Sequence, residues 1–344
     1  MRVFLALHIV PDDLHLTNSL ASFTPPDAVR EIGLVVYWPH SRTIITVKEG
    51  MIMPTVGTGK YTYTLTQDWA KLPAGETFAM VSAVATDSQD RVYAFQRKDP
   101  PIVVFDRAGT YLSSWGNGAF LFAHGIYIAN DIVYLTDRDS STCLVYTLDG
   151  KPIQMLGRHG VHSDTGCERP GDLVPRAAGP FNYPTELVPD PAGDLFVSDG
   201  YRNARIHRFD PDGHLKFSWG EPGKTEPNHY HLPHSLVIHD GRIYICDREN
   251  HRIQVCTPDG QSLAIWTDIQ RPMDISVDRD GIFYVSEGSV QGSSARVSVL
   301  TNTGAVLARF DCRGPGHGSW VDSHGDIYVG LSNPGGVDKY VRQS

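Results

Sequence analysis

A repeat of short strands runs through most of this chain and constrains its fold more than any other feature. One unit is clear where Leu232–Leu236, Gly241–Ile245 and Arg252–Val255 alternate like strands separated by turns. An aromatic residue marks the second strand of each unit, at Tyr93, Tyr134, Phe196, Tyr244, Tyr284 and Tyr328. Units of roughly 35–50 residues built from short strands indicate an all-β fold, and six of them predict a six-bladed β-propeller.

A second periodic position lies ten or eleven residues before each aromatic residue, on the expected first strand. Its occupants, in chain order, are Ser82, His124, Thr185, His234, Met273 and His317. Alternate blades of a six-bladed propeller lie about 120° apart, so the three histidines should converge on the axis. Three neutral nitrogen ligands with an open fourth position are typical of a catalytic zinc site. The competing interpretation, polar side chains in a solvated tunnel, suits a lone histidine better than three on alternate repeats.

The repeat predicts a propeller over residues 55–344. Tyr61–Leu65 alternates like a strand and would supply the outer strand of the last blade, so that the N-terminal strand closes the ring. Residues 1–50 lack the repeat, and we expect an irregular N-terminal extension there. A disordered segment and an over-extended start codon are the alternatives. An insertion rich in Gly and Pro, Gly157–Pro180, separates the second blade from the third.

Composition excludes several classes of function. The net charge of −9 and the lack of a basic run argue against nucleic-acid binding, and no apolar run is long enough to span a membrane. The five cysteines include no C-x-x-C pair, which favours a cytoplasmic chain. We also expect a monomer. Secretion is the alternative, although His8 interrupts the short apolar N-terminal run and makes it a weak signal peptide.

Several segments resemble one enzyme family. The segments are Pro184–Glu186, Val197–Ile206, Trp219–Glu221, Leu232–Leu236 and Asp247–Gln254. They are similar to peptidyl-α-hydroxyglycine α-amidating lyases, which are six-bladed propellers of NHL repeats, and the resemblance covers roughly residues 75 to 335. It implies a zinc-dependent lyase that cleaves the C–N bond of a carbinolamide, of the N-acyl-α-hydroxyglycine type, to an amide and glyoxylate. The expected partner is therefore a small molecule that carries a carboxylate.

The resemblance also assigns site residues. It implies that His124, His234 and His317 bind Zn²⁺, and that Tyr201, Arg97 and Arg248 are catalytic. The repeat register supports the arginines separately, because Arg97 and Arg248 follow the second strands of their blades at equivalent positions. A pair of guanidinium groups at such a rim would hold a carboxylate. An ion pair within the loop, such as Arg248 with Glu249, is the alternative, and we expect the equivalent Arg138 to be structural.

The chain departs from the family pattern at several positions. The family's paired cysteines are replaced by Asn182 with Arg202 and by Tyr244 with Val255. The aspartate that binds a structural Ca²⁺ in the family is Gly318 here, which argues against that ion, although backbone carbonyl groups near residues 84 and 126 remain as ligands. Pro315 replaces a methionine near the third histidine, so we expect a substrate pocket of different shape.

These departures leave three other functions open. The first is a related zinc lyase or hydrolase that acts on another small substrate such as ureidoglycolate, which shares the carbinolamide core. The second is a non-catalytic NHL propeller that binds a protein or ligand. The third, a calcium-dependent lactonase-type propeller, is disfavoured because such a site needs axial carboxylates and the axial series contains none.

Overall fold

The computed structural model describes residues 3–7, 32–38, 41–47 and 55–343. The chain divides into two compact units, Met1–Pro54 and Thr55–Ser344. In the first unit, β1 (Val3–Leu7) pairs in parallel with β2 (Ile32–Trp38), which pairs antiparallel with β3 (Ser41–Val47). The described part of the segment that the sequence indicates as irregular therefore forms strands. The rest of residues 1–50 lies outside the described residues.

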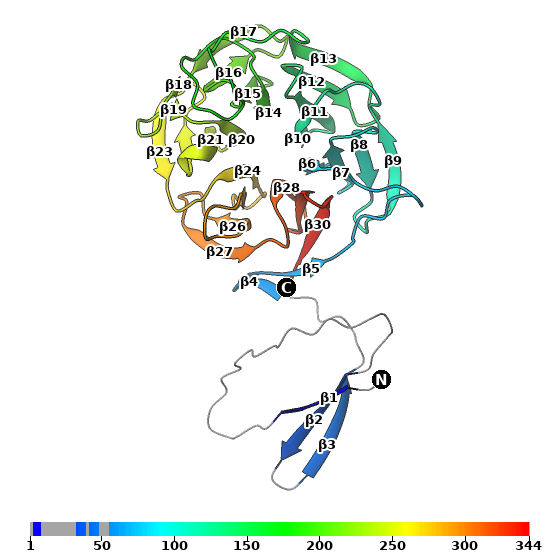
Figure 1. Ribbon diagram of the computed structural model, residues 1–344. Helices are drawn as coiled ribbons and strands as arrows, with labels where there is room; N and C mark the ends of the chain where they lie inside the picture. The colour runs from blue at the N-terminus through cyan, green and yellow to red at the C-terminus, as the bar shows by residue number, and fades with distance from the viewer. Residues whose placement is uncertain (1–2, 8–31, 39–40, 48–54, 344) are drawn as a thin grey trace. The chain divides into compact units, whose positions relative to one another are not determined.

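The second unit is a six-bladed propeller in which each blade is an antiparallel sheet, as the repeat predicts. Figure 1 shows the blades as a ring with their first strands innermost. The first blade contains β6 (Val81–Thr86), β7 (Val92–Gln96), β8 (Ile102–Phe105) and β9 (Tyr111–Trp115). The second contains β10 (Ala123–Ala129), β11 (Ile132–Asp137), β12 (Thr142–Thr147) and β13 (Pro152–Gly157). The third contains β14 (Pro184–Pro189), β15 (Leu195–Asp199), β16 (Arg205–Phe209) and β17 (Leu215–Trp219).

The fourth to sixth blades repeat this order. The fourth contains β20 (Pro233–His239), β21 (Arg242–Asp247), the 3₁₀ turn η1 (Arg248–Asn250), β22 (Arg252–Cys256) and β23 (Ser262–Trp266). The fifth contains β24 (Pro272–Val277), β25 (Phe283–Glu287), β26 (Arg296–Leu300) and β27 (Val306–Asp311). The sixth contains β28 (Gly316–Val321), β29 (Ile327–Ser332) and β30 (Gly335–Arg342). Between the third and fourth blades, the short strands β18 (Glu221–Pro222) and β19 (His229–Tyr230) pair in parallel.

The ring closes through a strand from the start of the unit, as the sequence predicts. Strand β5 (Tyr61–Thr66) pairs antiparallel with β30, and β4 (Thr55–Thr58) adds a fifth strand to the same sheet. The alternation in β5 explains its role, because Tyr61, Tyr63 and Leu65 are buried while the intervening threonines are half-buried. These three side chains join the core between the fifth and sixth blades, so closure also buries apolar surface.

The repeated aromatic residue holds the register within several blades. Tyr93, Tyr284 and Tyr328 are each at most 1% exposed. Their hydroxyl groups donate to the carboxylates of Asp87, Asp278 and Asp322, which stand in the turn between the first and second strands, at 3.2, 3.0 and 3.1 Å. A buried phenol needs such a partner, so each aromatic position links the blade core to its own turn.

An irregularity in the first strand of every blade shapes the axis. The pairing register shifts between Val81 and Ala83, Ala123 and Ile126, Pro184 and Glu186, Pro233 and Leu236, Pro272 and Asp274, and Gly316 and Ser319. A bulge breaks the strict alternation of side chains along a strand. As a result, consecutive residues such as Met273 and Asp274 line the same axial chamber.

In the part of the chain that the structure describes, no helix is long and apolar enough to cross a membrane. All five cysteines are free thiols.

The closing strand yields a test of the fold. Replacing Tyr63, which is fully buried and packs 5.5 Å from Phe310 between ring centroids, with alanine should destabilise the propeller by about 3–5 kcal/mol, because it leaves a cavity where the ring closes. Thermal unfolding of Tyr63→Ala beside the half-buried control Thr64→Ala would measure the effect. Equal unfolding temperatures would show that β5 contributes little to closure.

Candidate metal centre

Three histidines from alternate blades meet on the propeller axis. His124 lies on β10, His234 on β20 and His317 on β28, and they are 2%, 1% and 6% exposed. Their ring centroids are 4.8, 5.0 and 4.8 Å apart, which is close to threefold symmetry. Each offers one nitrogen to a group whose members all lie within 4.8 Å of one another. The register of the repeat thus places these side chains where the sequence predicts.

The intervening blades orient the three rings. The Nδ1 atoms of His124, His234 and His317 lie 2.7, 2.5 and 2.7 Å from the backbone carbonyl oxygens of Thr185, Met273 and Ser82. Each carbonyl belongs to the axial residue of the next blade. A carbonyl only accepts, so each Nδ1 must carry the proton and each Nε2 must present a lone pair. Such hydrogen bonds fix the tautomer of metal-binding histidines.

The surroundings keep these imidazoles neutral. Burial is the largest cause that lowers the pKa of all three, and the repulsion of nearby arginines adds to it. The pKa of His317 falls to about 3. Nε2 of His124 and Nε2 of His317 are buried and have no hydrogen-bond partner among the described residues. Neutral nitrogens with unused lone pairs are what a zinc ion requires, so the residues fit this metal.

Tyr201 lies beside one of the three histidines. It lies in the loop after β15, and its hydroxyl oxygen is 3.1 Å from Nε2 of His234. Nη1 of Arg248 donates to the same hydroxyl oxygen at 3.2 Å. The ring also packs edge-on against His124, with centroids 5.2 Å apart. The hydroxyl group is therefore beside the position that a metal ion or its bound substrate would occupy.

Arg97 and Arg248 both border the region of the histidines, but their guanidinium groups have different partners. Arg248 is tied by Nε to Glu249 at 2.8 Å, so the ion pair expected as an alternative role coexists with its contact to Tyr201. Arg97 donates from Nε to the backbone oxygen of Ala123 at 3.1 Å and stacks 3.8 Å over Phe122. No carboxylate of the described residues pairs with Arg97. Burial lowers its pKa to about 10, and repulsion by Arg138 adds to that effect.

Sequence reasoning missed part of this rim. Arg138, expected to be structural, places its guanidinium group 3.7 Å over the Phe122 ring and 4.8 Å from the centroid of Tyr201. Its Nε also pairs with Asp139 at 2.7 Å. Arg138 therefore borders the site and has a structural partner as well. Its position in the sequence could have indicated that Arg138 borders the site, because Arg138 follows the second strand of its blade as Arg97 and Arg248 do.

The axial series itself contains no carboxylate, but the residues that follow two of its members bring two carboxylates to the axial chamber. Glu186 and Asp274 follow the axial residues Thr185 and Met273, and both line the chamber that the histidines border. The bulges described above turn them inward, whereas regular alternation would point them away. At Gly318, where the resemblance would need a calcium-binding aspartate, an added Cβ would lie 2.5 Å from Cα of Ala83. That position has no room for a side chain, so the family's ligand does not fit here.

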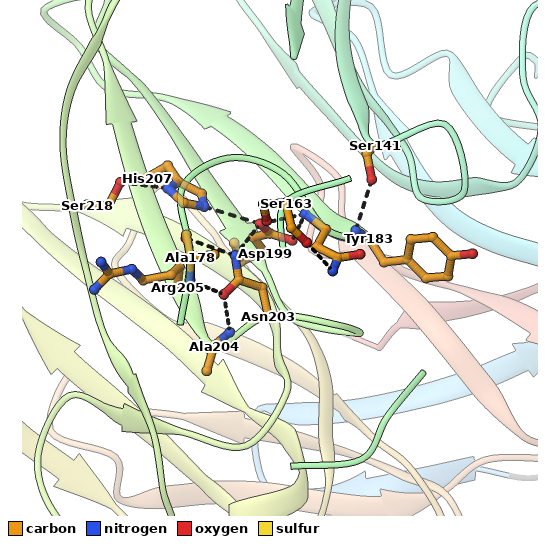
Figure 2. Close-up of polar contacts among 12 residues, drawn as sticks. Ser141, Ser163, Ala178, Tyr183, Asp199, Asn203, Ala204, Arg205, His207 and Ser218 are labelled. Carbon is orange, nitrogen blue, oxygen red and sulfur yellow. Dashed lines mark hydrogen bonds and ion pairs between the residues drawn. The ribbon is translucent and has the colours of Figure 1, made fainter. Parts of the chain in front are cut away.

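A buried polar network holds the loop that carries Tyr201 (Figure 2). Asp199 accepts hydrogen bonds from the backbone nitrogen of Asn182 at 3.0 Å and from Nδ2 of Asn203 at 2.9 Å. His207 bridges Asp199 and Ser218 at 3.2 and 2.7 Å. The hydrogen-bonded series Asp199, His207 and Ser218 has the residue types of a hydrolytic triad. However, Asp199 and His207 are fully buried, and backbone and amide donors already occupy the carboxylate. Its role is to fix the loop.

The same loop is bound to the insertion between the second and third blades. Nδ2 of Asn182 donates to the Ser163 backbone oxygen at 2.8 Å, and the Thr165 hydroxyl group donates to the Arg202 backbone oxygen at 2.6 Å. The backbone nitrogen of Gly171 donates to the backbone oxygen of Tyr201 at 2.7 Å. The positions that hold paired cysteines in the family thus lie side by side here, with hydrogen bonds in place of a disulfide.

Removing one histidine should empty the metal centre. In His234→Ala, two nitrogen ligands remain, and zinc content measured by plasma emission should fall by at least tenfold from the one ion per chain expected for the parent protein. His239→Ala is a matched control because His239 lies on the same strand outside the histidine group. Unchanged zinc in His234→Ala would contradict the assignment.

Comparisons with known proteins agree with the repeat. The NHL repeat profile matches residues 231–256, in the fourth blade. The human protein named NHL repeat-containing protein 3 is 32% identical over 264 residues, which are 71% of this chain and 71% of that protein. Peptidyl-glycine alpha-amidating monooxygenase A of Xenopus laevis is 33% identical over 184 residues, which are 49% of this chain but only 18% of its own length.

A shorter relative carries a lyase name. The Caenorhabditis elegans protein named probable peptidyl-alpha-hydroxyglycine alpha-amidating lyase is 27% identical over 217 residues, 59% of each chain. Among solved structures, a gluconolactonase of Xanthomonas campestris has a TM-score of 0.59 at 15% identity and covers 84% of this chain and 95% of that one, which supports the fold alone. The chain therefore belongs to the NHL-repeat protein family, and its relatives include the peptidyl-α-hydroxyglycine amidating lyases.

Proposed function

We propose that this protein is a zinc-dependent lyase that splits the C–N bond of a carbinolamide, R–CO–NH–CH(OH)–COO⁻, into an amide and glyoxylate. One observation carries the proposal: three buried neutral imidazoles converge beneath a hydroxyl group, Tyr201, that an arginine contacts. The similarity to amidating lyases supports the same reaction class. His124, His234 and His317 would hold the zinc ion, which supplies Lewis-acid polarisation of the bound hydroxyl group and lowers its pKa.

In this proposal, Tyr201 moves the proton. Its oxygen is 3.1 Å from a metal-facing nitrogen, within reach of a hydroxyl group bound at the centre. In the reaction the substrate hydroxyl group loses its proton, its oxygen forms the aldehyde C=O of glyoxylate, and the C–N electron pair moves to nitrogen. The amide nitrogen gains one proton, so the net transfer is from oxygen to nitrogen. A single side chain between the two atoms can relay that proton.

In this proposal, Arg97 binds the carboxylate. It is the rim arginine without a carboxylate partner among the described residues, whereas Arg248 pairs with Glu249 and Arg138 with Asp139. A guanidinium group with unused donors binds a carboxylate strongly, most of all away from bulk water. Arg248 donates to Tyr201, so its contribution is to orient the phenol and to stabilise negative charge on its oxygen.

The direct test is glyoxylate release from N-acetyl-α-hydroxyglycine by the zinc-loaded protein, with and without a zinc chelator. Chelator-sensitive release is the expected result. Release from ureidoglycolate but not from the N-acetyl compound would favour the related lyase on another small substrate. A metal-free protein with no activity on either compound would overturn the proposal and favour a binding propeller.

Loss of the Tyr201 hydroxyl group should affect turnover rather than metal content. In Tyr201→Phe, kcat should fall by about 10²–10⁴-fold because the proton relay is lost, while zinc stays at the parent level. Tyr183→Phe removes a neighbouring phenol that packs against His162 and not against the three axial histidines, and it serves as the control. A parallel fall of zinc and activity in Tyr201→Phe would assign Tyr201 a structural role.

The role of Arg97 can be tested with a substrate that lacks the carboxylate. Arg97→Gln should reduce kcat/KM for N-acetyl-α-hydroxyglycine by about 10–150-fold, since a hydrogen bond to a charged group contributes about 1.5–3 kcal/mol. It should change kcat/KM little for N-(hydroxymethyl)acetamide, which has the same carbinolamide without the carboxylate. Equal losses on both compounds would show that Arg97 does not bind the carboxylate.

A further inference from the structure

One phenylalanine at the rim of the site supports two arginines. Phe122 directly precedes β10 and Arg138 directly follows β11, so both stand at the same end of the second blade. The guanidinium carbon atom of Arg138 lies 3.7 Å from the centroid of the Phe122 ring, and that of Arg97 lies 3.8 Å from the same centroid. Two cations from neighbouring blades therefore rest on one half-buried ring.

Main-chain contacts hold this ring in place beside Arg138. The backbone nitrogen of Phe122 donates to Oδ1 of Asp137 at 2.8 Å, and the backbone nitrogen of Arg138 donates to the Phe122 backbone oxygen at 3.1 Å. Asp137 is 1% exposed, so water does not compete for the first of these contacts. The support for both cations is thus organised within the protein itself, which reduces the cost of ordering them around a ligand.

Both arginines are anchored through Nε and keep donor groups at the far end of the side chain. Nε of Arg138 donates to Asp139 at 2.7 Å, and Nε of Arg97 donates to the Ala123 backbone oxygen at 3.1 Å. Nη1 of Arg97 lies 2.9 Å from the sulfur atom of Met80, which is a weak acceptor. Among the described residues, neither Nη atom of Arg138 has a hydrogen-bond partner, nor does Nη2 of Arg97, and none of the three is sealed from solvent.

The positive charge of the two arginines is only partly balanced. Asp139 offsets the charge of Arg138, but no carboxylate of the described residues lies within 4.0 Å of Arg97, so one positive charge remains. Burial lowers the pKa of Arg97 to about 10, and repulsion by Arg138 adds to that effect. A singly charged anion bound between the two guanidinium groups would offset this repulsion.

The same two arginines lie close to the histidines. Burial is the main cause that lowers the pKa of His124 and of His317, and the charges of Arg97 and Arg138 lower both values further. In an α-hydroxyglycine, the hydroxyl and carboxylate groups are attached to the same carbon atom. A hydroxyl group bound at the histidines therefore brings its carboxylate to a position next to the centre, where these arginines stand.

From this geometry we propose that Arg138 binds the substrate carboxylate together with Arg97, as a carboxylate clamp of two guanidinium groups on the Phe122 ring. A carboxylate accepts up to about four hydrogen bonds, which the unused donors of two guanidinium groups can supply. Phe122 is a positioning residue, because it contacts the arginines. The identity of the substrate rests on the proposed function. Arg138, expected from the sequence to be structural, then has a role in binding as well.

An unreactive analogue tests the clamp without any need for catalysis. N-acetylglycine keeps the carboxylate and the amide of the proposed substrate but lacks its hydroxyl group. In calorimetric titrations of the zinc-loaded full chain, the Kd of N-acetylglycine should be about tenfold or more higher for Arg138→Gln than for the parent protein. Arg138→Lys keeps the charge but loses the planar fork, so its Kd should lie between the two.

Arg309→Gln is the matched control. Arg309 lies on β27, outside the rim, and pairs with Asp268 at 3.0 Å. Its side chain is 24% exposed, compared with 15% for Arg138, so the two variants remove the same charge from similarly buried positions. Arg309→Gln should bind N-acetylglycine as the parent protein does.

A substrate without a carboxylate separates binding from structural damage. Arg138→Gln should lower kcat/KM for N-acetyl-α-hydroxyglycine by about tenfold or more, mainly through KM, because the carboxylate loses one of its two partners. It should change kcat/KM little for N-(hydroxymethyl)acetamide, and zinc content should stay at the parent level. Equal losses on both compounds would assign Arg138 a structural role and overturn the proposal.

The binding and activity measurements distinguish the clamp from the lyase reaction. The clamp is overturned if the parent protein does not bind N-acetylglycine at about 10 mM, or if Arg138→Gln binds it as tightly as the parent does. If N-acetylglycine binds through Arg138 but no glyoxylate is released, the clamp stands and the proposed function fails. If glyoxylate is released and Arg138→Gln behaves as the parent does, the proposed function stands and the clamp fails.

Discussion

The hydrogen bonds from the three histidines to the next blade are the contacts on which the rest of the site depends. Each of the three imidazoles, in His124, His234 and His317, lies within hydrogen-bond distance of the carbonyl oxygen of the following axial residue. The same contacts therefore set both the orientation of the rings and the spacing between neighbouring blades. The axial residue of an intervening blade needs no particular side chain to orient the imidazole, because its backbone carbonyl oxygen accepts the hydrogen bond. That explains why Ser, Thr and Met can alternate with histidine in the axial series while the arrangement of the three imidazoles is preserved.

The repeat makes much of this structure predictable from sequence. Aromatic positions such as Tyr284 and axial positions such as His317 recur with an offset of ten or eleven residues, so the blades, the closing strand and the convergence of the histidines follow from counting. The orientation of Glu186 and Asp274 cannot be predicted in this way. The alternation of side chains along a strand predicts that a residue next to an inward-facing one points outward. The bulge reverses that expectation, and nothing local in the sequence announces it.

Positive and negative side chains occupy different levels along the propeller axis. Arg97, Arg138 and Arg248 gather around Tyr201, while the carboxylates stand further along the first strands, and the neutral imidazoles border both groups. Burial lowers the pKa of the histidines most, and the arginines lower it further, so both favour the unprotonated form that a metal would require. The same arginines would attract an anionic substrate. One set of cations can therefore serve metal binding and substrate binding together.

The loop of Tyr201 shows how a departure from the family can keep a site intact. Asn182 and Arg202 stand where the resemblance places a disulfide, and the backbone of Arg202 donates to that of Asn182 at 3.2 Å. A disulfide restrains mainly the unfolded chain, whereas hydrogen bonds act on the folded loop and need an interior that excludes water. The insertion provides that cover through Ser163 and Thr165. The insertion is thus part of what positions Tyr201, because without it the polar atoms that replace the disulfide would compete with solvent.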